Sequence, residues 1–158
     1  MLFAYHRNYG LDIGILRIFN TYGPRMRIDD GRVIPEFFKN AIKNTDIPIF
    51  GSRLQTRSLC YIDDLVDGVL LMMESNAIGP INLGNPDEIS VIDLAKDIVT
   101  LLESSSNVTY KELMKDDPKQ RKPDITLAKT ILGWEPKIYR NRGLEKTLDY
   151  FKTKLNGL

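Results

Sequence analysis

The feature that most constrains the fold is the apolar run IGILRIF at residues 13–19, which is followed by Asn20, Thr21 and a Gly-Pro turn. A short run rich in branched aliphatic residues is typical of a strand buried on both faces of a parallel sheet. Such a strand needs neighbouring strands, and the residues before it are too few to supply them. We therefore expect it to pair with strands that follow, or to belong to a longer protein.

Helical and strand-like patterns alternate along the rest of the chain, which favours parallel pairing and an α/β fold. In the helix starting at Asp63 or Asp64 we expect Leu65, Val66, Val69, Leu70 and Met73 to point inward. Ser90 with Asp93 three residues later is a variant of the capping box, and Gly133 is placed to end a short helix. The expected helices are 1–9, 33–43, from 63 or 64 onward, from 90 onward, 124–133 and 141–155, and the expected strands are 13–19, 47–50, 55–62, 80–83 and 108–110.

Composition excludes several function classes. The 22 basic and 21 acidic residues leave a net charge of +1, which predicts no nucleic-acid partner, and the chain has no apolar run long enough to cross a membrane. Cys60 is the single cysteine and His6 the single histidine, so we expect no disulfide and no metal site built on these residues. Cysteine usage fits a reducing compartment, and we expect a cytoplasmic protein.

Polar residues that could carry chemistry lie at a strand end and in loops. Asn20 ends the first strand, and ligands of open α/β sheets bind at the carboxyl ends of strands. Arg32, Arg57 and Arg121 lie in loops, where converging guanidinium groups could bind a diphosphate. Loop arginines are also commonly solvated or paired with nearby acids, as Arg121 could be with Asp116, and that alternative stays open.

The parts that a complete dinucleotide enzyme needs are not expected in this chain. It contains no G-x-G-x-x-G loop to hold a pyrophosphate. We also expect no Tyr-x-x-x-Lys pair, so the chain has the character of a substrate-binding unit without a reaction centre.

Four segments taken together carry a resemblance: RIFNTYGPRM with DDGRVIP, GSRLQTRSLCYIDDLVDGV, INLGNPDEISVIDLA, and DDPKQRKPDITLAKTILGWEPK. In this order and spacing they resemble the C-terminal half of the UDP-glucuronate decarboxylases (UDP-xylose synthases), which are extended short-chain dehydrogenases/reductases. The resemblance implies an α/β fold comprising the C-terminal substrate-binding part of such an enzyme. The last strand or strands of the Rossmann sheet would be present, without its nucleotide-binding N-terminal half. Residues 1–32 would be the end of the Rossmann-type domain, and residues 33–158 a nucleotide-sugar-binding α/β domain.

The resemblance also implies a reaction, a cofactor and partners. The whole protein would convert UDP-glucuronate to UDP-xylose and carbon dioxide with NAD, which the missing N-terminal half would mainly bind, and it would be a homodimer. This chain alone is expected to be inactive, and no residue in it is assigned to the acid/base pair. A 4,6-dehydratase or 4-epimerase acting on another sugar nucleotide, and a non-catalytic nucleotide-sugar-binding module, remain alternatives.

Site roles follow from the resemblance residue by residue. Asn20 would contact the UDP-sugar, Thr21 the nicotinamide side of NAD, and Arg32 would lie between the cofactor and the carboxylate of the substrate and orient that carboxylate. Three further groups would hold the nucleotide and the diphosphate: Ile34, Pro35, Glu36, Phe37 and Phe38; Gly51, Ser52, Arg53, Leu54, Gln55 and Arg57; and Pro118, Lys119, Gln120, Arg121 and Lys122.

Two positions depart from the family pattern. Glu36 stands where the decarboxylases often carry an amide, and its carboxylate would be repelled by a diphosphate unless it pairs with Arg53 or turns outward. Arg53-Leu54 replaces a small, glycine-containing pair. Arg17, Arg25 and Arg27 are assigned no role.

Overall fold

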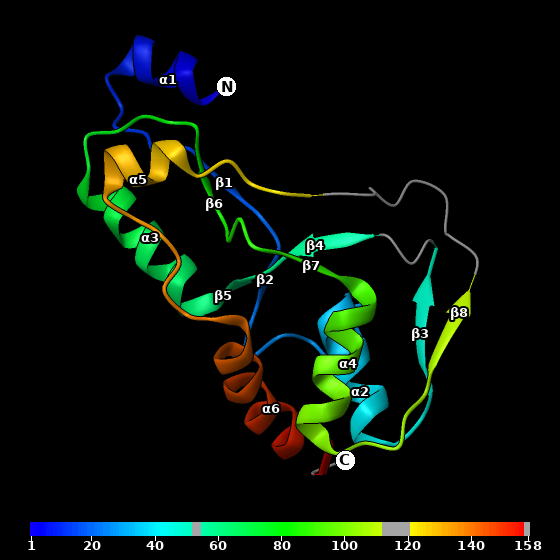
Figure 1. The fold of residues 1–158 in the computed structure, drawn as a ribbon. Helices are drawn as coiled ribbons and strands as arrows, with labels where there is room; N and C mark the ends of the chain where they lie inside the picture. The colour runs from blue at the N-terminus through cyan, green and yellow to red at the C-terminus, as the bar shows by residue number, and fades with distance from the viewer. Residues whose placement is uncertain (52–54, 112–120, 157–158) are drawn as a thin grey trace.

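The computed structural model describes residues 1–51, 55–111 and 121–156. Its elements pack around two apolar clusters. The larger cluster lies among three helices, α2 (Val33–Ile42), α4 (Val91–Leu102) and α6 (Arg140–Asn156), which stand together in the lower part of Figure 1. The parallel pair β3 (Ile47–Phe50) and β8 (Val108–Lys111) lies beside α2 and α4.

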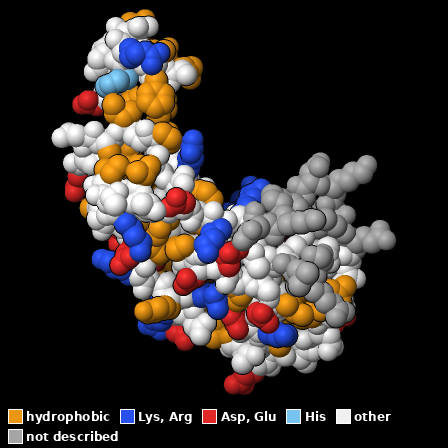
Figure 2. Space-filling model, turned by 45° about the horizontal axis from the view of Figure 1, so that its top comes forward, with side chains coloured by type: hydrophobic (Ala, Val, Ile, Leu, Met, Phe, Trp, Pro, Cys, Tyr) orange, Lys and Arg blue, Asp and Glu red, His pale blue; other side chains and the backbone are white. Residues whose placement is uncertain are grey.

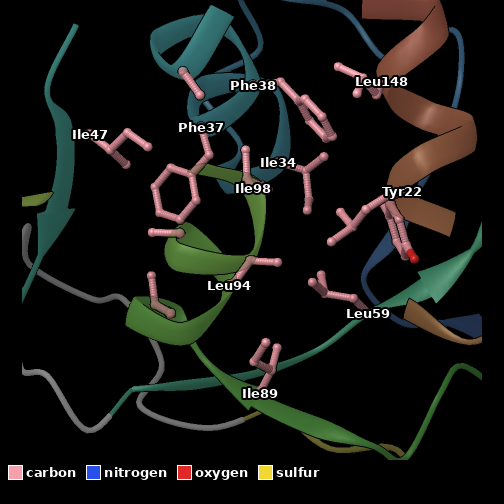
Figure 3. Close-up of a cluster of buried hydrophobic side chains, with 14 of the residues drawn as sticks. Tyr22, Ile34, Phe37, Phe38, Ile47, Leu59, Ile89, Leu94, Ile98 and Leu148 are labelled. Atoms are coloured by element: carbon pink, nitrogen blue, oxygen red, sulfur yellow. The ribbon is translucent and has the colours of Figure 1, made fainter. Parts of the chain in front are cut away.

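The larger cluster forms because each helix presents one apolar stripe. Phe38 of α2 is fully buried and stacks on Phe151 of α6, with ring centroids 5.3 Å apart. Leu94 and Ile98 of α4 are one turn apart and fully buried, and Figure 3 shows both within the same cluster as Phe38. This packing holds α2 and α4 side by side and fixes the loops that precede them.

The smaller cluster gathers around the parallel pair β1 (Leu16–Ile18) and β6 (Ile81–Leu83), with α3 (Ile62–Glu74) and α5 (Thr126–Leu132) packed against it. Trp134, which follows α5, is buried as expected, and its indole N–H donates to the Asp64 carbonyl at 2.8 Å.

Asp64 joins the two parts of the molecule. Its side chain is buried, and its two carboxylate oxygens accept from the backbone N–H groups of Lys137 and Ile138 at 3.0 and 2.9 Å. Asp64 therefore anchors the segment between α5 and α6 to the start of α3.

Two short strand pairs connect the clusters. β2 (Thr21–Tyr22) pairs in parallel with β5 (Cys60–Tyr61), and β4 (Thr56–Ser58) pairs antiparallel with β7 (Glu88–Ser90). The helix α1 (Leu2–Tyr9) projects away from the rest of the molecule at the top of Figure 1.

The expected α/β class and most of the expected elements are confirmed. The strand 47–50 has the bounds expected of it, Ser90 accepts from the Asp93 N–H at the start of α4, and Gly133 ends α5 in a left-handed conformation. The strand expected at 55–62 is instead two strands, β4 and β5, interrupted at Leu59, and residue 62 already belongs to α3.

Expectations about burial were wrong in two places. The strand at 13–19 is not buried on both faces, because Ile18 is 60% exposed. Val66, Leu70 and Met73 of α3 point outward, since the inner face of this helix consists of Asp64, Leu65, Gly68 and Met72.

The expected division at residue 32 stays a prediction, and both apolar clusters include residues from each side of it. Tyr22, from the first part, is buried in the larger cluster, and the partners of β1 in the smaller cluster come from residues 60–134. The reason is that parallel strands must be joined by crossovers, so neighbours in space are far apart in the sequence.

Candidate functional site

A pocket of about 740 Å³ lies beside the larger cluster, at the carboxyl end of β1. Its walls come from the end of β1, the start of α2, the end of β3, strand β4 and the start of α4. The structure brings eight of the expected site residues together there: Asn20, Thr21, Arg32, Ile34, Glu36, Phe37, Gln55 and Arg57.

Asn20 and Thr21 enter the pocket from the carboxyl end of β1. The Asn20 carbonyl accepts from the Cys60 N–H at 2.9 Å, which fixes the backbone at the strand end. The Thr21 hydroxyl donates to the Phe19 carbonyl at 2.9 Å and keeps its lone pairs to accept a hydrogen bond. Within the described ranges, the side-chain amide of Asn20 makes no hydrogen bond, so both its donor and its acceptor can meet a ligand.

Arg32 is held at the entrance to α2 by Asp30. The Asp30 carboxylate accepts from the Arg32 backbone N–H at 3.0 Å and from Nε at 2.7 Å, and it also pairs with the Arg32 Nη2. Burial opposes ionisation of Asp30, but the hydrogen bonds from Arg32 outweigh it and keep the pKa of Asp30 below its usual value. The Arg32 side chain is still 60% exposed, so it is oriented without being covered.

Gln55 and Arg57 line the pocket from β4. Gln55 is only 3% exposed. Its backbone carbonyl accepts from the Val91 N–H at 3.0 Å, and this bond joins the segment to the start of α4. The Arg57 Nη1 donates to the Thr56 carbonyl at 2.9 Å. Strand β4 and the residue before it therefore place a cation and an amide side chain in the pocket wall.

Glu36 is engaged within its own helix. Its carboxylate accepts from the Asn40 Nδ2 at 3.2 Å and lies 3.9 Å from Lys39 Nζ. Lys39 in turn lies 3.2 Å from Asp29. These contacts offset the negative charge that Glu36 brings to the pocket wall, and Arg53, its expected partner, lies outside the described residues.

Other expected site residues lie elsewhere. Pro35 and Phe38 do not line the pocket, because the helical period turns these positions of α2 toward the core while Ile34 and Phe37 reach the pocket. Gly51, Arg121 and Lys122 are also absent from its walls, and Lys122 lies 3.5 Å from Glu88. Ser52, Arg53, Leu54, Pro118, Lys119 and Gln120 fall outside the described residues.

Sequence reasoning missed several apolar residues of the pocket. Phe50 and Pro48 come from β3, Val91 from α4, and Met26 from the loop after β2. A usable signal was the alternation in β3, where Ile47 and Ile49 are buried and Phe50 is half-exposed.

The expectation that the chain contains no Tyr-x-x-x-Lys spacing was wrong. Tyr150 and Lys154 have this spacing in α6. Tyr150 packs edge-on against Phe151 at the larger cluster, and Lys154 is exposed. Neither residue lines the pocket, so this pair is a feature of the helix surface and not an acid/base pair of the site.

The described residues contain neither a metal-binding cluster of side chains nor a membrane-spanning helix. In the described ranges, no three His, Cys, Asp or Glu side chains come together to hold a metal ion. None of the described helices combines the length and apolar character needed to span a membrane.

Comparison with known proteins gives relatives for nearly the whole chain. It is 47% identical over 156 residues to UDP-glucuronic acid decarboxylase 3 of Arabidopsis thaliana, covering 99% of this chain and 46% of the relative. It is 43% identical to UDP-glucuronic acid decarboxylase 1 of Xenopus tropicalis, covering 98% of this chain and 37% of that protein. The chain therefore spans about half or less of the length of these curated relatives.

Solved structures match the fold with similar coverage. UDP-glucose 4-epimerase from Thermotoga maritima, solved with UDP-glucose, superposes with a TM-score of 0.93 at 33% identity over 98% of this chain and 50% of that one. UDP-glucuronic acid 4-epimerase from Bacillus cereus, solved with UDP-glucuronic acid and NAD, gives 0.88 at 33% identity over 96% and 49%. The model of the NAD dependent epimerase/dehydratase family matches residues 1–84. With its strand-end site and its α/β fold, this chain belongs to the NAD dependent epimerase/dehydratase family.

Proposed function

We propose that this chain is the nucleotide-sugar-binding part of an NAD-dependent UDP-glucuronate decarboxylase, which converts UDP-glucuronate to UDP-xylose and carbon dioxide. The observation that carries the proposal is the pocket that joins a strand-end amide to two positioned arginines, Arg32 and Arg57. The curated relatives at 41–47% identity support the choice of reaction, because they are named as UDP-glucuronic acid decarboxylases.

In this proposal, different pocket residues contact different parts of the substrate. Arg57 and Gln55 meet the diphosphate, Phe37 and Phe50 supply apolar surface for the nucleoside, and Asn20 hydrogen-bonds the sugar. Arg32 binds the C6 carboxylate, for which a guanidinium oriented by Asp30 is suited. Once C4 is oxidised, the ketone lies β to that carboxylate, and carbon dioxide can leave.

The residues present fit one end of NAD only. The free amide of Asn20 and the lone pairs of the Thr21 hydroxyl, at the carboxyl end of β1, suit the nicotinamide end, whereas the chain has no glycine-rich loop for the pyrophosphate. NAD would supply the hydride acceptor for oxidation at C4 and the hydride donor for the reverse step. We propose that Thr21 and Arg32 contact it and that the rest of the cofactor is held outside this chain.

The second candidate is a nucleotide-sugar 4-epimerase or 4,6-dehydratase. The solved UDP-glucuronic acid 4-epimerase from Bacillus cereus favours the epimerase within this pair, since that enzyme also binds a sugar carboxylate. A non-catalytic nucleotide-sugar-binding module is the third candidate. We further propose, on the resemblance alone, that the whole protein is a homodimer and is cytoplasmic.

Calorimetric titration of this chain with UDP, UDP-glucose and UDP-glucuronate tests the site. We expect UDP-glucuronate to bind at least about tenfold more tightly than UDP-glucose, because the carboxylate adds a charge-assisted hydrogen bond worth about 1.5–3 kcal/mol. Arg32→Ala should remove the preference for UDP-glucuronate over UDP-glucose, while Arg57→Ala should weaken the binding of all three ligands. Arg142→Ala is the matched control, since Arg142 is exposed and pairs with Glu145 in α6.

Equal affinity for the two sugars in the unmodified chain would count against a decarboxylase. The reaction itself is decided by product analysis after joining this chain to the rest of the family fold, with NAD and UDP-glucuronate. Release of carbon dioxide with UDP-xylose supports the proposal, and a C4 epimer without carbon dioxide supports the second candidate.

A further inference from the structure

The guanidinium group of Arg32 has two edges that can bind a carboxylate, and Asp30 occupies one of them. The Asp30 Oδ2 accepts from the Arg32 Nε at 2.7 Å and also from Nη2. A guanidinium has five N–H donors in a planar fork, so these bonds use the donor on Nε and one of the two on Nη2. The end of the fork is left, with two donors on Nη1 and one on Nη2. Among the described residues, no other group bonds to this side chain.

The contact between Asp30 and Arg32 differs from the ordinary ion pairs of the molecular surface. Figure 2 shows Lys and Arg side chains interspersed with Asp and Glu over the described part of one face. Arg140 and Arg142 each meet a carboxylate through a single hydrogen bond. Arg32 meets Asp30 through three, because its backbone N–H also donates to Oδ1 at 3.0 Å. Arg32 also lines the candidate pocket, so the orientation of its side chain matters to a ligand there.

The local backbone makes this three-bond contact possible. Gly31, between the two residues, has a φ of 75°, a left-handed conformation that glycine adopts without steric cost. The chain turns there, and one carboxylate can reach both the backbone and the side chain of Arg32. Arg32 is in turn the N-cap residue of α2, in an extended conformation. The guanidinium group is therefore fixed relative to the start of this helix and to the pocket wall that it forms.

Neighbouring charges keep Asp30 ionised. Burial favours the neutral form of its carboxyl group, but the hydrogen bonds and the charge of Arg32, with a smaller contribution from the charge of Arg27, lower its pKa. The adjacent carboxylate of Asp29 contacts a different cation, Lys39, at 3.2 Å. The two adjacent aspartates therefore have different partners, and only Asp30 acts on the guanidinium group in the pocket.

Asp30 can affect the binding of a carboxylate in two ways, which have opposite signs. As a negative charge it repels the ligand and lowers the affinity. As an orienting group it removes rotamer freedom from Arg32 before the ligand arrives, which raises the affinity. The Arg32 side chain is 60% exposed, so solvent weakens the repulsion, whereas the rotamer entropy of an arginine is among the largest of any side chain. The orienting effect therefore outweighs the repulsion.

We propose that Asp30 is the positioning residue that makes the end of the Arg32 fork the binding edge for a carboxylate. Nη1 and Nη2 each donate to one oxygen of that carboxylate, an arrangement that suits a planar guanidinium. A hydroxymethyl group has one oxygen and cannot accept from both donors in parallel. Asp30 therefore determines the preference for a uronate over a neutral hexose. For the identity of this ligand, the inference rests on the proposed function.

Calorimetric titration of variants with UDP-glucuronate and UDP-glucose tests the effect on the ligand, measured as the ratio of the two Kd values. Asp30→Asn keeps an oxygen for the backbone N–H of Arg32 but places an amide N–H₂ against the guanidinium group. It should lower the preference for UDP-glucuronate by about three- to tenfold, because Arg32 regains rotamer freedom. Asp29→Asn is the matched control, since it removes the same charge from the adjacent position, and it should leave the preference unchanged.

NMR spectroscopy of the chain without ligand tests the positioning itself. The Nε–H of an arginine that is fixed by a carboxylate exchanges slowly with water, so isotope-labelled arginine should give a protected Nε–H signal for Arg32. Arg32→Lys assigns this signal by its loss. Asp30→Asn should abolish the protection, and Asp29→Asn should retain it. Circular dichroism verifies that each variant is folded.

Two outcomes would overturn the proposal. One is an Arg32 Nε–H that is unprotected in the unmodified chain or stays protected in Asp30→Asn. The other is a preference for UDP-glucuronate that Asp30→Asn leaves unchanged or increases, as the loss of a repelling charge alone would do. Equal affinity of the unmodified chain for the two sugars counts against the proposed function, whereas a protected Nε–H that Asp30→Asn abolishes would still support positioning by Asp30.

Discussion

At the scale of single residues, Gly143 shows how closely the start of α6 approaches the centre of the molecule. A Cβ at this position would overlap the Tyr22 hydroxyl and would lie 2.9 Å from both Tyr22 Cζ and Tyr61 Cδ2. Tyr22 is 1% exposed and donates its hydroxyl to the Arg140 carbonyl at 3.1 Å. Burial raises the pKa of Tyr22, so its hydroxyl stays a neutral donor. Only glycine lets the helix pass at this distance.

We therefore expect Gly143→Ala to lower the free energy of unfolding by roughly 1–3 kcal/mol through overpacking. This loss is expected even though alanine is more favourable than glycine inside a helix by about 1 kcal/mol. Urea unfolding measures the change. In a Tyr22→Phe background the overlapping oxygen is gone, so the cost of Gly143→Ala should be smaller there. An equal cost in both backgrounds would show that Tyr22 is not the obstacle.

At the scale of elements, α4 depends on Ser90, the residue that caps its N-terminus. The Ser90 hydroxyl accepts from the Asp93 N–H at 3.1 Å and donates to the Asp93 carboxylate at 2.6 Å. This reciprocal contact satisfies a backbone donor at the helix start, and it lowers the pKa of Asp93, with a smaller contribution from Lys96. The same helix carries Leu94 and Ile98 into the larger cluster, so its start and its packing are coupled.

Ser90→Ala should lower the free energy of unfolding by about 1 kcal/mol because a capping hydrogen bond is lost. Ser90→Thr, which keeps the hydroxyl, should recover most of the stability. Thr100→Ala is the control, since Thr100 is exposed in the interior of α4 and alanine has the higher helix propensity. Unchanged urea midpoints for Ser90→Ala would mean that the cap does not support α4.

At the scale of the whole molecule, the chain contains a packed part and a part that nothing in its described residues covers. The packed part includes α2, α4 and α6 around fully buried side chains such as Phe38 and Ile98. The uncovered part includes α1, which has no buried residue. Local stability follows the number of buried apolar contacts, so the two parts should differ in how often they open.

Hydrogen exchange followed by mass spectrometry measures this difference. In the monomeric chain, we expect the backbone amides of α1 to exchange at rates close to those of an unstructured peptide, because α1 buries no side chain. The amides of α4 should be protected to nearly the global stability of the chain and serve as the internal reference. Protection of α1 equal to that of α4 in a monomeric sample would contradict the structure of this part.

The elements could be predicted where the signal is local. Ser90, Gly133 and the strand at 47–50 depend on neighbouring backbone groups, and each was identified from the sequence. Burial in α3 could not be predicted in the same way. Met73 is as apolar as Met72, and only the position of β1 decides that Met72 is covered and Met73 is not.

The residues of the candidate site, too, could be predicted only where the sequence signal is local. Asn20 was identified because a polar residue at the end of an apolar strand is a local pattern, and it does line the pocket. Phe38 was misplaced because α2 has two apolar sides, one toward the pocket and one toward Phe151 of α6. Phe50 and Val91 were missed because their place in the wall depends on how β3 and α4 pack.

By itself the sequence determined the order and type of most elements, the caps at Ser90 and Gly133, and the polar residues at the end of the first strand. These depend on interactions between residues a few positions apart. Tertiary structure alone decided that Arg32 lines the same pocket as Arg57 and Gln55, and that Tyr150 and Lys154 lie away from it. It also decided that β1 pairs with β6 alone among the described strands. Those outcomes depend on which distant segments pack together, and periodicity in the sequence marks an apolar face without saying what will cover it.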